Sequence, residues 1–529
     1  MADSSLTARA DASMPRAFCL AIAGLVLAGS WLLWFATRWG IGLYTDSIVY
    51  VGTARSILAG TGVSYFNDIG QFAPVIQYPP LYPAMVAAVS LSGLDALDSA
   101  RWLSIICYGA NALLVAYIVY NASSSSYAAL LAALLSMTAF PMVYIHSQAL
   151  TEPIFIFMVF LGFALLQRYL DRPRLWVLLC CALCMGISCL VRYVGIAFVI
   201  TGALVVLFLG GDNWLRRFIE TIKFGIVSSL PLAAWAVRNF LSAGNPVNRT
   251  FSFHPPPPKD FLPLIDTMAQ WLLPIAIVES LPWLGWFVIG LTFAMFVCLA
   301  RKTELSRSKP LRLILYCVSG YMLFLLISWT FNDQPLYFDT RTMALPYVGL
   351  MILTVCIISG RLRKAAWPAK SWRRFGVNCV LIVVIALSTI NSVLWLQQSY
   401  GDGIGYATEP WRNSELLNYV KGADESRSIY SNAPDFIFTL TGKTATMIPH
   451  KIHPWTKQPN NQWPGEIAAM RETLSQRNGM LVYFNGEERL WYLPSENELK
   501  TNLPLQIVKT ATDGRIYSLK NVVASSQKR

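Results

Sequence analysis

The stretch that decides the fold is residues 17–37, AFCLAIAGLVLAGSWLLWFAT, in which no residue is charged. A helix of this length spans the ~30 Å hydrocarbon core of a bilayer. The run is long for a signal peptide, and no clear small-residue cleavage site precedes Asp46, so we expect an uncleaved anchor. Asp46 is the first acidic residue after the run. An acid just beyond the first membrane span suggests chemistry at the membrane surface on a lipid-borne substrate.

The whole chain has the composition of a membrane protein. Of its 529 residues, 55% are hydrophobic and 13% are charged, and the mean hydropathy is +0.47. Backbone polar groups inside a bilayer must be satisfied within the chain, so apolar runs of this length should be helices. We predict a polytopic α-helical membrane protein with about eleven transmembrane spans. The predicted spans are 17–37, 100–120, 127–145, 153–170, 175–190, 194–210, 219–240, 271–299, 313–331, 342–360 and 375–396.

Basic residues in the short loops give the orientation, because cytoplasmic loops are enriched in Lys and Arg. Four loops that fall on one side of the predicted topology carry pairs or clusters of basic residues, including Arg172 with Arg174 and Arg216 with Arg217. The N-terminus falls on the same side, which we take as cytoplasmic. The net charge of +13 is mostly this bias. It therefore gives no indication of nucleic-acid binding.

The chain is expected to have three parts. Residues 1–16 are a cytoplasmic N-terminus, 17–397 a transmembrane domain with an outer loop at 38–99, and 398–529 a small extracytoplasmic α/β domain. Within the outer loop, 47–58 and 81–91 have the pattern of helices with one apolar face, which predicts that they lie along the membrane surface.

The C-terminal part has short periodic segments. We predict helices at 413–420, 433–440 and 466–476, strands at 428–430 and 480–484, and a hairpin of 503–510 with 515–519 around Asp513-Gly514.

Two acidic residues are candidate catalytic groups, since charged groups in or beside membrane spans usually mark function. Asp46 precedes the 47–58 helix, so its alternative role is a helix cap. Glu152 lies in Leu150-Thr151-Glu152-Pro153 at the outer end of a span, and its alternative role is also a cap. The predicted topology puts both acids on the outer side of the membrane.

Four arginines, Arg192, Arg238, Arg249 and Arg341, lie at outer span ends or in outer loops, against the positive-inside pattern. The planar guanidinium donates two parallel hydrogen bonds to a phosphate, so we assign these residues to a donor phosphate. Their alternative role is contact with lipid headgroups. Further candidate substrate-binding residues on the same side are Tyr44, Asp68, Tyr78 and His146.

The chain resembles the polytopic GT-C glycosyltransferases, close to the protein O-mannosyltransferase, bacterial aminoarabinose transferase and Rgt-type families. The resemblance covers roughly residues 17–360 and rests on the order and topology of five short motifs. These motifs are Tyr44-Thr45-Asp46, Tyr78-Pro79-Pro80-Leu81-Tyr82-Pro83, Leu150-Thr151-Glu152-Pro153, Leu190-Val191-Arg192-Tyr193 and Asp339-Thr340-Arg341-Thr342.

The resemblance implies an enzyme that moves a sugar from a polyprenyl-phosphate donor to a lipid, glycan or protein acceptor on the outer face of the membrane. It implies that Asp46 is the catalytic acid of the first loop. The family often has a second acid beside it, whereas Ser47 and Ile48 follow here, so a bound divalent metal is not favoured and we expect no cofactor. The alternative is a divalent-metal site that Asp46, Glu152 and Asp68 assemble from separate loops. Relatives also have Lys where this chain has Tyr78. Catalysis by one carboxylate, with arginines on the phosphate, predicts a single displacement that inverts the anomeric centre.

Two other functions fit parts of the sequence. A lipid-linked-sugar flippase or transporter would also place acids and arginines along a pathway, but we find no inverted repeat of the kind transporters show. A non-catalytic membrane scaffold would present the 398–529 domain, but it would not need the patterned loop at 38–99. The compact loops favour a bacterial inner membrane as the location, with membrane lipids and the lipid-linked sugar as partners.

Overall fold

The structure is a computed structural model. It describes residues 14–66, 72–211, 213–246, 253, 255–301, 308–331, 338–364, 372–453, 458–485 and 491–520. The chain divides into two compact units. The first unit contains Met1–Gly42 and Ile76–Ile404, and the second contains Leu43–Val75 and Gly405–Arg529.

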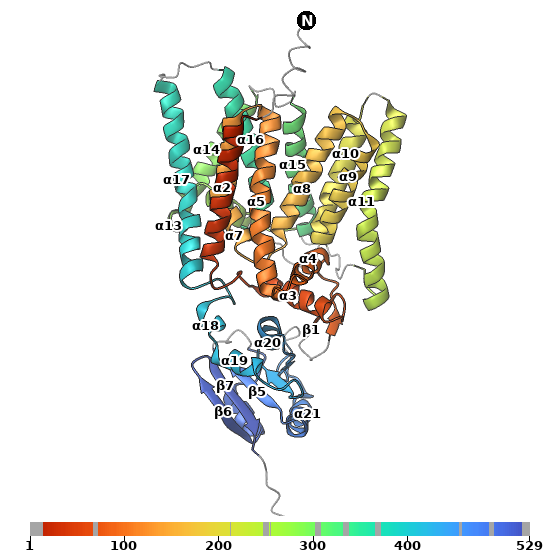
Figure 1. Cartoon of the computed structure of the whole chain (residues 1–529), viewed down its shortest axis with the longest axis vertical. Helices are drawn as coiled ribbons and strands as arrows, with labels where there is room; N and C mark the ends of the chain where they lie inside the picture. Colours follow the sequence, from red (N-terminus) through yellow and green to blue (C-terminus); the bar gives the residue numbers. More distant parts are fainter. Residues whose placement is uncertain are drawn as a thin grey trace, which may run out of the picture. The chain divides into compact units, whose positions relative to one another are not determined.

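The first unit is a bundle of long helices that lie side by side (Figure 1). Short helices α4 and α7 lie among them, and the 3-10 turn η1 separates α9 from α10. The elements are α2 (Arg16–Ala36), α4 (Leu81–Ser90), α5 (Ala96–Ser123), α6 (Ser126–Thr138), α7 (Phe140–His146), α8 (Glu152–Asp171), α9 (Leu175–Val191), η1 (Tyr193–Gly195), α10 (Ile196–Leu209), α11 (Trp214–Ala243), η2 (Pro258–Phe261), α12 (Leu262–Ala269), α13 (Ile275–Ser280), α14 (Pro282–Arg301), α15 (Lys309–Phe331), α16 (Ala344–Lys364) and α17 (Trp372–Gly401).

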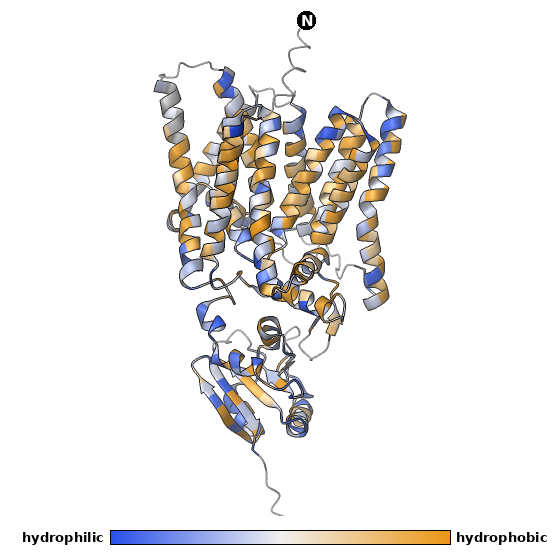
Figure 2. Ribbon diagram, in the orientation of Figure 1, coloured by the Kyte–Doolittle hydropathy of each residue, from blue (hydrophilic) through white to orange (hydrophobic). Residues whose placement is uncertain are grey.

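Each of the eleven predicted spans coincides with a helix or a pair of helices in this unit. Among the described residues, seven helices are long and apolar enough to cross a membrane, and α6 with α7 is an eighth candidate, bent by 55°. The remaining predicted spans correspond to the shorter apolar helices α9, η1–α10 and α14. Figure 2 shows the bundle helices mostly in the hydrophobic colour. The chain is therefore a multi-pass membrane protein, as the sequence predicted.

The bend between α6 and α7 follows from Ala139 and Pro141. Ala139 is extended, and Pro141 has no backbone N–H to donate to the preceding turn. The carbonyl groups near the break accept hydrogen bonds from other helices instead: Tyr108 donates to Met137 O, and Ser392 Oγ lies 2.6 Å from Thr138 O. Because the backbone remains satisfied, the helix can break inside an apolar bundle.

The two ends of the bundle differ in composition. The start of α8, the end of α9 and the turn before α16 lie together at one end, because Glu152 bonds to Arg192 and Arg341, and we call this the site end. At the other end the loops carry the basic residues used above for the orientation, including Arg172 and Arg174 between α8 and α9 and Arg216 at the start of α11.

The second unit is an α/β domain. Its elements are α3 (Thr45–Leu58), β1 (Ser64–Phe66), β2 (Phe72–Pro74), α18 (Glu409–Arg412), α19 (Glu415–Lys421), β3 (Ile429–Ser431), α20 (Pro434–Thr441), β4 (Thr446–Met447), α21 (Trp463–Gln476), β5 (Met480–Phe484), α22 (Glu496–Asn502), β6 (Leu505–Ala511) and β7 (Gly514–Leu519). β1 and β2 form an antiparallel pair. The other strands form one sheet in the order β4-β3-β5-β7-β6, in which β3 is parallel to both β4 and β5.

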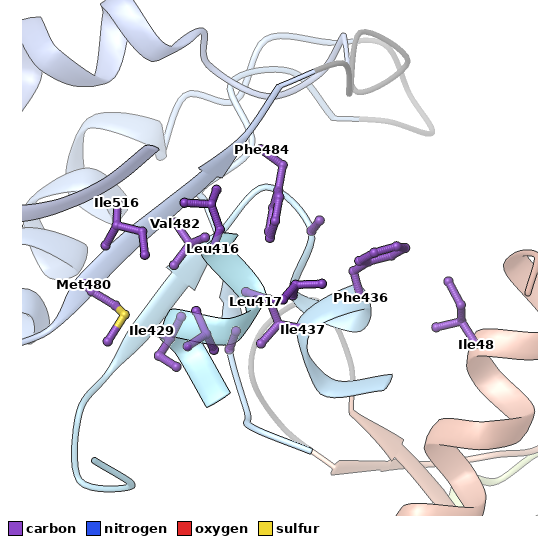
Figure 3. Close-up of a cluster of buried hydrophobic side chains, with 13 residues drawn as sticks. Ile48, Leu416, Leu417, Ile429, Phe436, Ile437, Met480, Val482, Phe484 and Ile516 are labelled. Atoms are coloured by element: carbon purple, nitrogen blue, oxygen red, sulfur yellow. The ribbon is translucent and has the colours of Figure 1, made fainter. Parts of the chain in front are cut away.

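Two apolar clusters cover the two faces of this sheet. One contains Leu416, Phe436, Ile437, Val482 and Ile516, and Figure 3 shows their side chains together. The other contains Met470, Leu474, Leu481, Leu499 and Tyr517. Val482 and Leu481 are neighbours on β5 but belong to different clusters, because successive strand residues point to opposite faces.

The C-terminal elements agree with the sequence prediction: β5 has the predicted bounds, and α20, α21 and the β6–β7 hairpin lie where expected. The sequence did not predict α22 or the β1–β2 pair. The structural unit also has other bounds than the expected C-terminal domain of residues 398–529. Its C-terminal part begins at Gly405, and it includes Leu43–Val75 from the predicted outer loop.

The surface location predicted for the two loop helices is wrong. Ile48 of α3 belongs to the apolar cluster of the second unit. Tyr82, Val86 and Ala87 of α4 are buried in the first unit, where α4 contacts α5 and α9. The apolar faces of both helices are therefore covered by protein.

Candidate functional site

The loop between α7 and α8 is buried at the site end of the bundle and carries Glu152 at its end. Ser147, Gln148 and Thr151 each have 2% of their surface exposed or less. Buried loops need partners for their polar groups. Gly42 N donates to Ser147 O at 2.9 Å, and Trp395 Nε1 donates to Ser147 Oγ at 2.8 Å. These contacts fix the path of the chain into α8.

Glu152 binds two arginines through one carboxylate oxygen. Its Oε1 lies 2.6 Å from Arg192 Nη1 and 3.0 Å from Arg341 Nε. The Glu152 side chain is 4% exposed, whereas those of Arg192 and Arg341 are 27% and 22% exposed. Thr151 joins the group, because its hydroxyl accepts a hydrogen bond from Arg192 Nη1 at 2.9 Å and donates one to Glu152 Oε2 at 3.3 Å. We call Glu152, Arg192 and Arg341 the ion triad.

Arg192 is positioned by the break between α9 and η1. Its backbone is extended, with φ −148° and ψ 135°, while its N–H still bonds to Ser188 O of α9. η1 then folds back closely onto the end of α9. A Cβ on Gly195 would lie 2.7 Å from both Cys189 N and Ser188 Oγ, so a residue larger than glycine would not allow this approach.

Arg341 lies in a turn just before α16. Asp339 Oδ1 accepts a hydrogen bond from Thr342 N at 2.8 Å, which satisfies a backbone donor of this turn. Tyr321 of α15 donates its hydroxyl to Thr342 O at 3.0 Å. The turn is therefore fixed both locally and by a neighbouring helix, and it brings Arg341 to a glutamate 189 positions earlier in the chain.

Arg238 of α11 is connected through Trp235 to Tyr193, the residue next to Arg192. Its guanidinium carbon lies 4.7 Å from the centroid of the Trp235 ring, a cation–π geometry. Trp235 Nε1 donates to Tyr193 Oη at 3.0 Å, and Tyr193 donates to Ile76 O at 2.8 Å. The network links α11, η1 and the chain just before Tyr78.

His146 is fully buried, and both of its ring nitrogens have hydrogen-bond partners. Nδ1 lies 2.7 Å from Met142 O, which can only accept, so Nδ1 carries the proton. Nε2 then accepts from Asn111 Nδ2 at 3.1 Å, and that amide also donates to Pro153 O at 2.9 Å. This geometry favours a structural role for His146, fixing α7 against α5 and α8, over the predicted contact with substrate.

Asp46 lies in the second unit, in the first turn of α3. The N-cap of this helix is Tyr44 and its first residue is Thr45. Asp46 is therefore the second residue of the helix and does not occupy the cap position. A carboxylate there is stabilised by the positive end of the helix dipole. Asp46 is half-buried, and Tyr44 is 38% exposed.

Two of the predicted site residues, Asp68 and Arg249, lie outside the residues that the structure describes. Tyr78 belongs to the first unit and is half-buried just before α4.

The sequence analysis assigned no role to Asn111, Thr151, Tyr193 or Trp235, which position the predicted residues. Thr151 and Tyr193 appeared there only as members of quoted motifs. Asn111 could have been found, because it is a polar side chain in the middle of the predicted 100–120 span, and such residues usually have a specific partner. Tyr193 and Trp235 gave no such signal, since aromatic residues are common at span ends.

In the described parts of the chain, no three His, Cys, Asp or Glu side chains are grouped so that they could hold a metal ion. The acidic member of the ion triad is already bonded to two guanidinium groups. The donor set at this end of the bundle is therefore cationic, which suits an anionic ligand better than a cation.

Comparison with known sequences gives one family match. Residues 69–241 match the model of the family described as Dolichyl-phosphate-mannose-protein mannosyltransferase. The matched segment contains Glu152, Arg192 and Arg238, and it ends before Arg341. No curated protein matches the chain.

Solved structures share the fold over nearly the whole chain. ArnT from Cupriavidus metallidurans, solved with undecaprenyl phosphate, has a TM-score of 0.62 at 14% identity, and the match covers 96% of this chain and 99% of ArnT. The arabinofuranosyltransferase AftD from Mycobacteria gives 0.55 at 15% identity, over 96% of this chain and 42% of AftD. The oligosaccharyltransferase AglB from Archaeoglobus fulgidus, solved with an inhibitory peptide and a dolichol-phosphate, gives 0.51 at 10% identity, over 94% and 74%.

These solved structures share the GT-C fold, and the sequence prediction of this fold is confirmed. Over residues 69–241 the chain is also similar to the Dolichyl-phosphate-mannose-protein mannosyltransferase family.

Proposed function

We propose that the chain transfers a sugar from a polyprenyl-phosphate donor to an acceptor molecule, and that the ion triad binds the donor phosphate. The observation that carries the proposal is the bonding of Arg192 and Arg341 to the buried Glu152 in a GT-C fold. Support also comes from ArnT, whose solved structure holds undecaprenyl phosphate, and from AglB, whose structure holds a dolichol-phosphate.

The chemistry requires positive charge at the leaving group. Breaking the bond between the anomeric carbon and the lipid phosphate leaves negative charge on the phosphate oxygens, and fixed cations stabilise that charge. The two guanidinium groups and one carboxylate of the triad sum to a net charge of +1. Both arginine side chains are partly exposed, at 27% and 22%, so a phosphate can approach them.

In this proposal Glu152 positions the arginines and is not the catalytic base. A base must accept a proton from the acceptor hydroxyl, whereas Glu152 is 4% exposed and accepts hydrogen bonds from Arg341 and Thr151.

Asp46 remains the proposed base. It is half-buried in the first turn of α3, at the positive end of the helix dipole. In this reaction Asp46 takes the proton of the acceptor hydroxyl, and the hydroxyl oxygen attacks the anomeric carbon from the face opposite the lipid phosphate, which leaves. Such a single displacement inverts the anomeric centre. We propose that this reaction needs no divalent metal, because arginine supplies the counter-charge.

We further propose that the reaction takes place on the outer face of a bacterial inner membrane. The support is the bias of basic residues toward the end of the bundle opposite the ion triad. A reporter fused after Arg529 tests the orientation: alkaline phosphatase should be active there and green fluorescent protein should be dark. The reverse result would contradict the outer location.

The phosphate assignment is tested with two lipid probes. Purified protein in nanodiscs should bind undecaprenyl phosphate at least ~10-fold more tightly than undecaprenol, which lacks the charged group. Equal affinities would overturn the phosphate site. Mass spectrometry of a strain that lacks the chain should show an accumulated polyprenyl-phosphate sugar, and this donor lipid can then be isolated for transfer assays. An unchanged lipid profile would argue against the transferase.

A further inference from the structure

The helix that carries Asp46 is part of the hydrophobic core of the C-terminal domain. Ile48 is 6% exposed and belongs to the same cluster as Phe436 and Ile437 of α20. In Figure 3 the Ile48 side chain lies next to that of Phe436, although the two come from opposite ends of the sequence. α3 and α20 lie in the same compact unit, so this packing is internal to that unit.

One face of α3 makes this contact along most of its length. Ile48, Gly52 and Arg55 are four and three residues apart, which places them on one side of a helix. A Cβ on Gly52 would lie 3.7 Å from the ring of Phe438. Arg55 Nε donates to Thr439 O at 3.1 Å, near the end of α20. Apolar packing and a hydrogen bond therefore fix both the tilt and the rotation of α3.

The β1–β2 pair, which follows α3 in the chain, also packs against Phe438 of α20. The ring centroid of Phe438 lies 5.5 Å from that of Phe66 and 6.0 Å from that of Phe72. Phe438 is 6% exposed and thus fills the space between α3 and the two strands.

A second attachment holds the start of α3. Leu43 pairs with Gly405 in a parallel bridge, and Tyr406 N donates to Leu43 O at 3.0 Å. Gly405 has φ +56°, and a Cβ there would lie 2.1 Å from Leu43 O, so this close approach requires glycine. Tyr406 in turn packs on Phe436, with ring centroids 4.2 Å apart.

Asp46 lies between these two attachments. An α-helix turns by about 100° per residue, so Asp46 lies about 200° around α3 from Ile48, on the side away from α20. We infer that Phe438 and Arg55 are positioning residues: by holding one face of α3, the C-terminal domain sets the direction of the Asp46 carboxylate. This inference rests on the proposed role of Asp46 as the base.

The test compares Phe438→Ala with Phe438→Leu and with a matched control, Leu474→Ala. Leu474 is 2% exposed and belongs to the cluster on the other face of the sheet, so its truncation loosens the same domain without touching α3. Each protein is assayed in nanodiscs for sugar transfer from the donor lipid isolated from the deletion strain and for binding of undecaprenyl phosphate.

A misplaced catalytic group lowers turnover rather than ground-state binding. Phe438→Ala should lower kcat by at least ~10-fold and leave undecaprenyl phosphate affinity within ~2-fold, because small displacements of a reacting group are costly. Phe438→Leu should restore most of the rate. Leu474→Ala should keep kcat per folded protein within ~2-fold of the original chain, since distant sites act independently. Normal turnover in Phe438→Ala, or an equal loss in Leu474→Ala, would overturn the inference.

Arg55→Ala provides a second test if Phe438→Ala does not fold, since it removes the bond to Thr439 O and no core ring. It should also lower kcat, with more rapid hydrogen–deuterium exchange in residues 43–58. Unchanged kcat in Arg55→Ala would count against the inference.

Asp46→Asn separates this proposal from the one on which it rests. If Asp46→Asn keeps normal activity, the base role fails and the positioning role with it. If Asp46→Asn is inactive while Phe438→Ala and Arg55→Ala turn over normally, only the positioning role fails.

Discussion

Arg192 Nη1 lies 2.6 Å from Glu152 Oε1, and the carboxylate in this pair is almost completely buried. An ion pair at the end of a membrane bundle costs desolvation free energy, which good geometry and additional hydrogen bonds must offset. Thr151 provides such bonds on one side, and Arg341 provides a second cation on the other. The pair therefore belongs to a prearranged cationic group rather than to a simple helix cap.

The ion triad predicts coupled stability effects. Glu152→Gln should destabilise the protein by about 3 kcal/mol, because two guanidinium groups lose their buried counter-charge. Adding Arg341→Gln to Glu152→Gln should cost less than the sum of the two single changes. The stability of all three variants is measured from their unfolding midpoints in detergent. Strictly additive losses of stability would contradict a shared network.

Replacement of Arg341 should distinguish phosphate binding from contact with lipid headgroups. Arg341→Ala should weaken binding of undecaprenyl phosphate more than Arg341→Lys, because lysine keeps the charge but loses the planar donor fork. Lys309→Ala, at the opposite end of the bundle, is the matched control for loss of one positive charge. Equal and small effects of all three changes would favour headgroup contact.

Replacement of Asp46 tests the proposed base. Asp46→Asn keeps the size of the side chain, so folding and membrane insertion should be preserved. Transfer should fall by at least ~10² because the acceptor proton has no carboxylate to receive it. The measurement is sugar transfer in nanodiscs, with monodispersity on gel filtration as the control for folding. Near-normal transfer would return Asp46 to a role at the helix terminus.

Metal removal tests the proposed source of counter-charge. Hard cations such as Mg²⁺ and Mn²⁺ prefer several oxygen ligands, and Asp46 is followed by Ser47 and Ile48 rather than by a second acid. Transfer in nanodiscs should therefore persist with excess EDTA. Complete loss of activity that Mn²⁺ or Mg²⁺ restores would instead identify Asp46 as a metal ligand.

The C-terminal domain should lose a local interaction in acid. Partial burial raises the pKa of Glu496, but hydrogen bonds from Tyr517, Arg515 and Lys500 outweigh burial, so its pKa lies below the ordinary value of 4.5. A carboxyl group with a lowered folded-state pKa stabilises the fold above its unfolded pKa, and that contribution is lost as pH falls through the folded pKa.

Glu496→Gln should accordingly increase hydrogen–deuterium exchange of β7 at pH 7. The difference from the original chain should shrink as the pH falls below about 4.5. A difference that stays constant down to strongly acidic pH would show that the effect does not come from ionisation of Glu496. Glu472→Gln on the exposed side of α21 is a suitable control.

Local patterns in the sequence were sufficient for the elements of the fold. Apolar runs such as 17–37 predicted the spans because a bilayer accepts only backbone that is hydrogen-bonded within the chain. Alternation and turn residues predicted β5 and the β6–β7 hairpin in the same way, from interactions between near neighbours. The sequence also singled out Glu152, Arg192 and Arg341, since a charged residue at a membrane span is costly and needs a reason to be there.

Tertiary structure alone decided which of these residues meet. A charge in a region of low dielectric needs a partner, but helix packing determines which partner it finds, so the bond between Glu152 and Arg341 across 189 positions left no local trace. The apolar face of α3 was equally ambiguous, because either a membrane surface or a protein core can cover it. Its position depends on the ring of Phe438, which packs on α3, and on the backbone of Gly405, which holds Leu43. Both residues lie more than 340 positions after α3 and contact these partners only once the chain has folded.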